Sequence, residues 1–151
     1  PRRGRHGVAM EIGHLIVEPG GRPCGCGNHG GLEQYASATA LRTTYAETAG
    51  DVLEASDIAA RAHDGDQRAR TAFSRAGAAL GFVVAHLAKV LDVPDVVIGG
   101  GLVGAWDLLE PAFTRRLDHD LLPVLRGKMR VRVSEAEDRA GMIGAAHLAL
   151  S

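Results

Sequence analysis

Cysteine, lysine and aromatic residues are all scarce in this chain. Its 151 residues include 2 cysteines, and aromatic residues make up 4% of the total. The 17 basic residues are almost all arginine, and 18 acidic residues give a formal net charge of −1. Two cysteines so close in sequence make a poor disulfide framework, which argues against a disulfide-stapled fold. Without an overall positive field, nucleic-acid binding is not expected either.

Long hydrophobic runs are also missing. The most apolar stretch, residues 82–91, is interrupted by His86 and Lys89 and is shorter than a membrane-spanning helix needs to be. Residues 4–13 contain glycine, histidine and glutamate where a secretory signal has its apolar segment. These absences predict a cytoplasmic protein without a membrane segment.

Glycine, in contrast, is abundant and clustered. The 20 glycines are about 13% of the chain, near twice the usual share. Many of them fall within residues 1–31, which we predict to be glycine-rich loops with one short strand over residues 14–18. A chain of 15.8 kDa has room for one domain of ordinary size.

Helical patterns fill the middle of the chain, residues 32–91. The composition there turns alanine-rich, and apolar residues recur every three or four positions in the longest pattern. We expect helices over residues 32–48, 55–63 and 69–90. Gly77 and Gly81 lie four apart on the last of these, where a missing side chain lets another backbone approach closely.

The last part of the chain, residues 94–151, alternates between strand and helix patterns. The expected elements are a strand over residues 96–98, a helix through residues 102–117, a strand over residues 129–133 and a closing helix over residues 141–150. Two strands that flank a crossover helix form a βαβ unit, which favours a parallel sheet. So thin a sheet beside so much helix indicates that further strands of the fold lie outside this chain.

A run of glycines follows the first of these strands. Residues 99–104 formally match the dinucleotide fingerprint G-x-G-x-x-G, but the nearest acidic candidates, Asp118 and Asp120, fall inside a helical pattern. A strand that delivers tandem glycines to a helix N-terminus still exposes backbone N–H groups and leaves room for a flat or anionic ligand. The alternative is a tight strand-to-helix turn without a ligand.

Residues with metal-binding side chains gather among the N-terminal glycines. His14, Cys24 and Cys26 offer the soft-to-borderline ligands that zinc selects, on loops that glycine can fold around an ion. A tetrahedral site needs a fourth ligand, for which His29 is the nearest further residue and water the other candidate. Free thiols are the alternative interpretation of the two cysteines.

Glu11 and Glu33 accompany these residues. Each lies beside a glycine-rich turn and not on a regular exposed helix face. Paired carboxylates near a histidine can accept hydrogen bonds from several sugar hydroxyls. The alternative is that both are solvated acids on loops.

At these positions the sequence resembles the ROK family of bacterial sugar kinases and sugar-responsive repressors. Residues 11–14, EIGH, match the family's E-x-G-H motif. Residues 24–33, CGCGNHGGLE, match its C-x-C-G-x-x-G-C-x-E motif at every fixed position except one. The stretches EQYAS, VIGGG and GAAHLA also look like actinobacterial ROK glucokinases, so the resemblance spans essentially the whole chain.

The resemblance implies an α/β fold, the helix-rich C-terminal lobe of an actin-like (ribonuclease H-like) ATPase with a small, mostly parallel sheet. It implies that Glu11, His14 and Glu33 contact sugar hydroxyls. The implied Zn²⁺ ligands are His14, Cys24 and Cys26, so that the metal orients a sugar-binding histidine. The residues implied to lie at the nucleotide, ATP with Mg²⁺ in the full-length protein, are Gly99, Gly100 and Gly101.

Two departures from the family pattern change these expectations. Gly31 stands where the family has its third cysteine, so we expect zinc to be held less tightly unless His29 replaces it. The family's phosphate-binding D-x-G-x-T segment and its aspartate base precede the E-x-G-H motif, and this chain begins just before that motif. We therefore expect the C-terminal part of a glucokinase-like kinase, inactive on its own because phosphoryl transfer needs that equipment.

The sugar-sensing lobe of a ROK transcriptional repressor is the alternative function, because it shares the same motifs. The stretch EQYAS favours the kinase. The expected partners are a hexose sugar and ATP. We also expect an apolar face where the N-terminal lobe would pack, which favours either docking of that lobe or a homo-oligomer.

Overall fold

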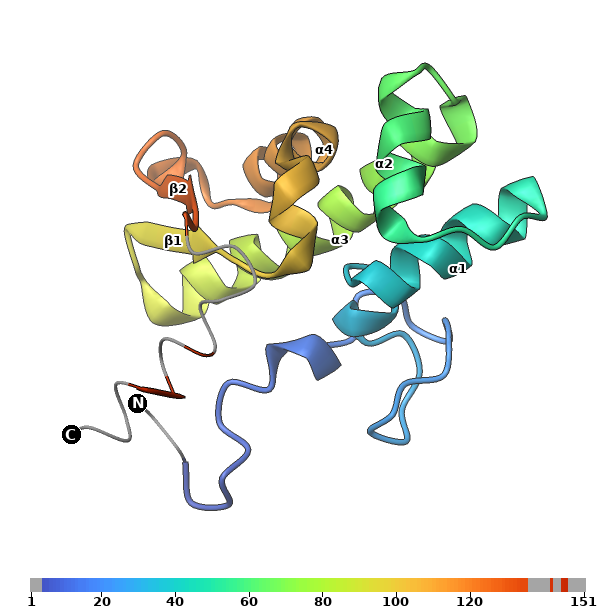
Figure 1. Cartoon of the computed structure of the whole chain (residues 1–151). Coiled ribbons are helices and arrows are strands. Elements are labelled where there is room, and N and C mark those ends of the chain that lie inside the picture. Colours follow the sequence, from blue (N-terminus) through green and yellow to red (C-terminus); the bar gives the residue numbers. More distant parts are fainter. Residues whose placement is uncertain (1–3, 136–141, 143–144, 147–151) are drawn as a thin grey trace.

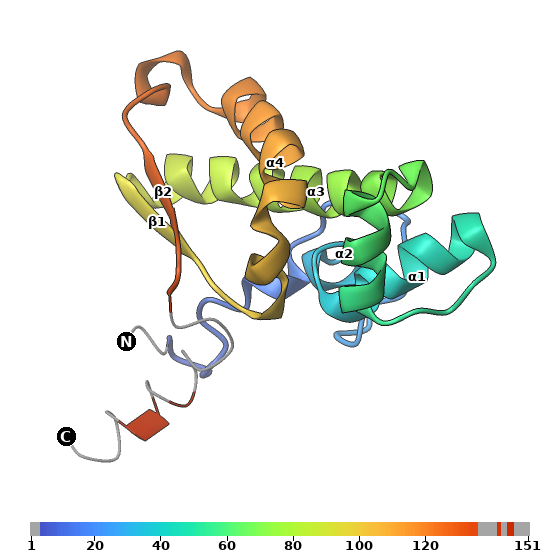
Figure 2. The ribbon, with the colours of Figure 1, turned by 45° about the horizontal axis from the view of Figure 1, so that its top comes forward.

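The computed structural model describes residues 4–135, 142 and 145–146 of the chain. In this part of the chain the α-helices are α1 (Ala38–Ala49), α2 (Ala55–His63), α3 (Gln67–Leu91) and α4 (Trp106–Asp120), and the strands are β1 (Asp95–Ile98) and β2 (Arg130–Val133). Short 3-10 helices cover Ile12–His14, Leu32–Gln34, Gly101–Ala105 and Pro123–Leu125. Figures 1 and 2 show α3 as the central element, with α1 and α2 towards one of its ends and both strands beside the other.

The long periodic pattern forms the expected helix, α3. Its N-terminus is capped by Asp66, whose carboxylate accepts hydrogen bonds from the backbone N–H groups of Arg68 and Ala69 at 2.8 and 3.3 Å. By length and composition alone α3 could cross a membrane. One face of α3, however, is buried against the other helices and the rest is exposed, as in the core helix of a globular domain.

Helix α4 crosses α3 at very close range, and the two α3 glycines make this possible. A Cβ atom at Gly77 would lie 2.3 Å from the carbonyl oxygen of Leu109, and one at Gly81 would lie 2.4 Å from that of Phe113. Neither distance is compatible with a side chain of any size. The prediction that these glycines admit another backbone is therefore confirmed, and the backbone is that of α4.

The βαβ unit is also confirmed. Strands β1 and β2 pair in parallel, with Asp95 opposite Arg130 and Ile98 opposite Val133, and α4 lies between them in the chain. The inner face of the sheet packs on an apolar cluster that includes Phe113 of α4. A second cluster, built around α1, α2 and the first half of α3, fills the other end of the molecule.

Two expected elements differ from the structure. The strand over residues 14–18 is wrong: only Ile16 pairs, in an isolated bridge to Gly31. The neighbouring Gly30 has a φ of 83°, a left-handed conformation that ends the ladder at once. The helix over residues 32–48 is interrupted after Leu32–Gln34. The closing helix over residues 141–150 lies almost entirely outside the described residues.

The interruption before α1 comes from the buried Tyr35 and from Ser37. The hydroxyl of Tyr35 accepts a hydrogen bond from the backbone N–H of Arg22 at 2.9 Å, which holds the side chain inside the fold. Ser37 is extended and caps α1, because its hydroxyl oxygen accepts a hydrogen bond from the backbone N–H of Ala40 at 3.1 Å. The same hydroxyl donates to the backbone carbonyl of Glu33 at 2.7 Å, so the start of α1 is tied to the segment before it.

Asp66 also ties α1 to the start of α3. Its Oδ2 atom accepts a hydrogen bond from the buried Tyr45 hydroxyl at 2.9 Å. This hydrogen bond lowers the pKa of Asp66 below its ordinary value; burial opposes the shift, and the backbone N–H groups of Ala69 and Arg68 reinforce it. Because the folded state prefers the carboxylate, the stabilisation is present above the ordinary pKa of aspartate and is lost as the pH falls through the lower, folded pKa.

We expect the free energy of unfolding to depend less on pH in the acid range in the Asp66→Asn variant. Asparagine still caps a helix but cannot titrate, so the free energy of unfolding should fall less steeply below about pH 4 than in the wild type. Asp66→Ala should lower the free energy of unfolding at neutral pH as well, since the cap is lost. Urea unfolding followed by circular dichroism across the acid range measures both effects. Asp64→Asn, at the exposed end of α2, is the matched control, and an equal change of slope in that variant would contradict the assignment.

Candidate functional site

The N-terminal loops form a small antiparallel hairpin that carries both cysteines. We call residues 23–29 the cysteine hairpin; it is closed by a bridge between Pro23 and His29. The backbone N–H of Cys24 donates to the carbonyl of Asn28 at 2.9 Å, and that of Gly27 donates back to the carbonyl of Cys24 at 3.0 Å. Gly27 has a φ of 90°, so the turn depends on glycine at this position. The hairpin therefore holds the two thiols in a defined place.

The cysteine hairpin meets two short 3-10 helices that carry His14 and Glu33. The Nδ1 atom of His14 lies 3.3 Å from the Sγ atom of Cys24 and 3.6 Å from the Oε1 atom of Glu33. The thiol of Cys24 donates to that same carboxylate oxygen at 3.3 Å. On the other side of the imidazole, the Oε2 atom of Glu11 lies 3.9 Å from Nε2. The two acids and the histidine thus lie close together beside the cysteine hairpin.

The metal-ligand group from the sequence also comes together. The ligand atoms of His14, Cys24 and Cys26 all lie within 4.8 Å of one another. This is close enough for one ion at ordinary Zn–N and Zn–S bond lengths. His29 is exposed on the far strand of the cysteine hairpin and, among the residues that the structure describes, is not part of this group. The suggestion that His29 replaces the missing ligand therefore finds no support.

Gly31 faces this ligand group directly. A Cβ atom at this position would lie 2.8 Å from the Sγ atom of Cys24. The backbone of Gly31 is extended, with φ −61° and ψ 149°, and this conformation accepts any residue. The position of the family's third cysteine is thus geometrically part of the cluster, and this chain has no side chain there.

The two thiols lie in different surroundings. Cys26 is exposed, and its pKa is lowered by the backbone of Asn28 and by the thiol of Cys24. Cys24 is buried; a hydrogen bond from the backbone of Cys26 lowers its pKa, but burial and the side chains of Cys26 and Glu33 outweigh this, so its pKa is raised. Of the two, Cys26 is therefore the readier to ionise.

The glycine turn after β1 lies away from the cysteine hairpin and borders two cavities. Gly100 has a φ of 102°, which requires glycine there. A cavity of about 260 Å³ lies between this turn, the first residues of α1 and the middle of α3. A second, of about 460 Å³, lies between the same turn and α2. Gly101 and Leu102 line both cavities, while Ser37 lines the first and His63 the second.

The sequence analysis did not assign Ser37 or His63 to a site, although Ser37 ends the EQYAS stretch. Ser37 lies 62 residues and His63 lies 36 residues before Gly99, and both reach the glycine turn only because α1 and α2 pack beside it. The Nε2 atom of His63 lies 2.7 Å from the Oδ2 atom of Asp107, which links α2 to the start of α4. A contact between residues 44 positions apart cannot be recognised from local sequence spacing.

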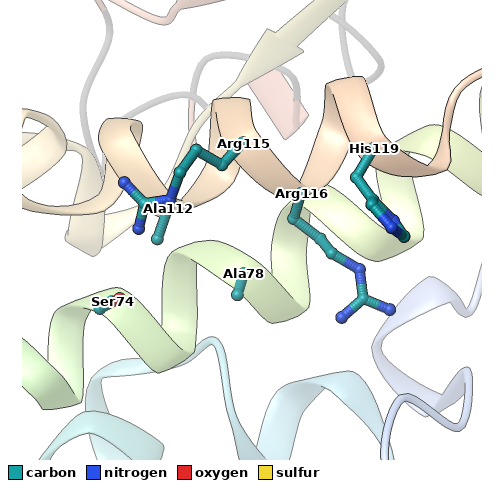
Figure 3. A pocket seen from close by; sticks show the side chains of 6 residues that line it. All are labelled: Ser74, Ala78, Ala112, Arg115, Arg116 and His119. Carbon is teal, nitrogen blue, oxygen red and sulfur yellow. The ribbon is translucent and has the colours of Figure 1, made fainter.

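A third cavity lies on the groove between α3 and α4, apart from both sites (Figure 3). It measures about 470 Å³ and is lined by small residues and by Arg115, Arg116 and His119. Arg116 and His119 both pair with Asp120 of the same helix. Burial would raise the pKa of Asp120, but these two partners outweigh it and lower the pKa below its ordinary value. The groove is thus basic but partly neutralised within α4.

Comparison with known proteins identifies relatives along the whole chain. The ROK family model matches residues 1–151. A glucokinase from Halalkalibacterium halodurans is 33% identical over 156 residues, covering 93% of this chain and 47% of that protein. An N-acetylmannosamine kinase from Yersinia pestis is 35% identical over 147 residues, covering 95% of this chain and 48% of that protein.

Solved structures agree. A ROK family glucokinase from Streptomyces griseus, in complex with glucose and AMPPNP, has a TM-score of 0.82 at 32% identity and covers 97% of this chain and 53% of its own. A ROK family transcriptional regulator, a homologue of the E. coli MLC protein, has a TM-score of 0.76 at 30% identity and covers 87% of this chain and 36% of its own. The similarity to the glucokinase is the closer of the two.

The chain belongs to the ROK family. Its fold is that of the actin-like sugar kinases in this family, helix-rich with a small parallel sheet, which confirms the expected fold class. The relatives that resemble it are glucokinases and N-acetylmannosamine kinases, and the kinase relationship is better supported than the relationship to repressors. The chain spans about half the length of these curated relatives.

Proposed function

We propose that this chain supplies the sugar-contacting and nucleotide-side half of a glucokinase-like kinase, which transfers the γ-phosphoryl group of ATP to a hexose hydroxyl. The observation that carries the proposal is the convergence of Glu11, His14 and Glu33 on one place beside the cysteine hairpin. The similarity to a glucokinase in complex with glucose and AMPPNP supports the same substrates. We expect no sugar phosphorylation by the chain alone. Glu11, His14 and Glu33 can position a sugar, but phosphoryl transfer also needs a loop that binds the phosphates.

The roles of the three residues follow from their chemistry. Glu11 and Glu33 lie on opposite sides of the His14 imidazole, each within 4 Å of one of its nitrogens. Carboxylates accept hydrogen bonds from hydroxyl groups, and a neutral imidazole both donates and accepts. Such a set can fix several neighbouring hydroxyls of one sugar ring, which positions the sugar without itself removing a proton.

The donor set also fits zinc. The ligands would be Nδ1 of His14 with the sulfurs of Cys24 and Cys26, because Nδ1 is the imidazole nitrogen that faces the sulfur atoms. Bound there, the ion would fix the orientation of the imidazole and leave Nε2 directed towards Glu11 and a sugar. Without a side chain at Gly31, water or another small ligand must complete the coordination.

For ATP, we propose the cavities beside Gly99, Gly100 and Gly101. The turn has no side chains to block a flat ring, and α1 and α2 provide walls on either side. The larger cavity, of about 460 Å³, falls within the usual size range of small-ligand sites. The Mg²⁺ that accompanies ATP would be bound mainly through the phosphates.

We expect glucose to shift the NMR signals of the His14 ring in a saturable way. The Glu33→Gln variant should raise the dissociation constant at least about tenfold, because it removes a charged acceptor of a sugar hydroxyl. Glu110→Gln, an exposed glutamate of α4, is the matched control and should leave binding unchanged. Absence of any saturable shift, or equal affinity in the two variants, would contradict the proposed sugar site.

A further inference from the structure

The two sulfur atoms of the cysteine hairpin lie in van der Waals contact. The Sγ atoms of Cys24 and Cys26 are 3.5 Å apart. A disulfide bond needs about 2.05 Å, so the two sulfur atoms need to approach each other by about 1.5 Å. The hydrogen bond from Gly27 to the carbonyl of Cys24 and the Pro23–His29 bridge fix the backbone around both cysteines.

Solvent can reach this pair from one side. Cys26 is exposed, whereas Cys24 is buried and only 7% accessible. A small oxidant therefore reaches the sulfur of Cys26 first, and the sulfur of Cys24 lies 3.5 Å from it. This arrangement of an accessible thiol with a neighbouring resolving thiol is the one that redox-sensitive cysteine pairs use.

Gly31 makes the pair more available for oxidation. In a four-ligand zinc site the metal would occupy both thiolates and keep them from reacting. Here the fourth side chain is missing at the position that faces Cys24, at a Cβ distance of 2.8 Å. Zinc and a disulfide exclude each other, because both need the same two sulfur atoms. Weaker metal retention thus leaves a larger share of molecules with free thiols.

We propose that Cys24 and Cys26 form a reversible intramolecular disulfide when the chain meets a peroxide. The thiolate of Cys26 attacks one peroxide oxygen, the O–O bond breaks, and hydroxide leaves, so that Cys26 becomes a sulfenic acid. The sulfur of Cys24 then attacks the sulfur of Cys26, the S–O bond breaks, and the departing hydroxide takes the thiol proton of Cys24 to leave as water. The two thiols lose two electrons and the peroxide gains them, and a dithiol reductant reverses the step.

The disulfide changes the candidate sugar site, a consequence that rests on the proposed function. Cys24 now donates its thiol proton to Oε1 of Glu33 and lies 3.3 Å from Nδ1 of His14. Oxidation removes that proton and draws the sulfur towards Cys26. Glu33 loses a hydrogen-bond donor and His14 loses its neighbour, so the two residues proposed to hold sugar hydroxyls lose a shared support.

Mass spectrometry of the purified chain tests the chemistry. The chain is first treated with a chelator and a dithiol, freed of both, and exposed to a modest excess of hydrogen peroxide. We expect a mass decrease of two hydrogens, loss of both maleimide-reactive thiols, a monomer on a non-reducing gel, and full reversal by dithiothreitol. Cys26→Ser, which changes an exposed side chain, should show none of the mass decrease. Thiols that remain reactive, addition of oxygen without cross-linking, or disulfide-linked dimers would each overturn the proposal.

Two further measurements separate this proposal from the proposed function. The disulfide should form at least about tenfold faster in the folded chain than in urea, because the hairpin holds the sulfurs together; equal rates would refute that role of the fold. The oxidised chain should bind glucose about tenfold more weakly than the reduced chain. Equal affinities would refute the link to the sugar site. If the reduced chain binds no glucose, the proposed function is wrong. Disulfide formation is tested separately, by the mass decrease.

Discussion

Alanine at Gly77 is expected to lower the free energy of unfolding by about 2 kcal/mol or more, the cost of forcing an extra group into a packed interface. The added Cβ would lie 2.3 Å from the carbonyl oxygen of Leu109, a backbone atom that cannot turn aside as a side chain could. Helix α4 must therefore move away from α3, which loosens both apolar clusters between them. The intrinsic preference of helices for alanine over glycine returns only about 1 kcal/mol.

Thermal unfolding followed by circular dichroism measures this loss. A change of 2 kcal/mol should lower the midpoint by about 4–8 °C in a chain of this size. Gly81→Ala should behave in the same way, since its Cβ would lie 2.4 Å from the carbonyl oxygen of Phe113. Gly104→Ala is the matched control, because a Cβ there meets nothing within 4 Å. If all three variants have the wild-type midpoint, the close approach of α3 and α4 is wrong.

The second large effect is expected for metal binding. Gly31→Cys should raise the affinity for zinc by at least about 100-fold, equivalent to about 2.7 kcal/mol, because a third thiolate completes a tetrahedral set. The extended backbone of Gly31 accepts cysteine without strain. The new Cβ would lie 2.8 Å from the sulfur of Cys24 and 3.2 Å from the carbonyl oxygen of Gly13. Rotation of the Cys24 side chain relieves the first contact, and a small backbone shift relieves the second.

Competition with a chromogenic zinc chelator measures the change in affinity, and metal analysis after dialysis gives the retained stoichiometry. Gly31→Ala is the decisive control, because it adds the same Cβ without the thiolate. We expect Gly31→Ala to bind zinc no better than the wild type, which separates ligation from crowding. If cysteine and alanine give the same affinity, the side chain at this position does not reach the metal, and the zinc site drawn from His14, Cys24 and Cys26 needs revision.

The parts of the fold that the sequence predicted are those with a dense local signal. The apolar period of α3 and the β-branched residues of β1 each lie within one element, so no distant residue was needed to recognise them. The pairing of β1 with β2 followed from chain order, since a helix lies between them. The interruption before α1 was missed because it depends on the hydroxyl of Tyr35 reaching the backbone of Arg22, thirteen residues away.

The candidate site divides in the same way. The positions of Glu11, His14 and Glu33 were available from two short motifs, and their convergence follows from how the cysteine hairpin folds back. What the motifs could not show is the contact between the sulfurs of Cys24 and Cys26, which depends on the geometry of the turn at Gly27. The contributions of α1 and α2 to the cavities at the glycine turn likewise arise only from tertiary packing.

The hydroxyl of Ser37 has a consequence for communication within the molecule. It donates a hydrogen bond to the backbone carbonyl of Glu33 at 2.7 Å, and Ser37 itself lines the cavity beside the glycine turn. Only three residues therefore separate an acid proposed to hold sugar from a surface proposed to hold ATP. A nucleotide that shifted Ser37 would therefore pull directly on the backbone of the residue that carries the acid.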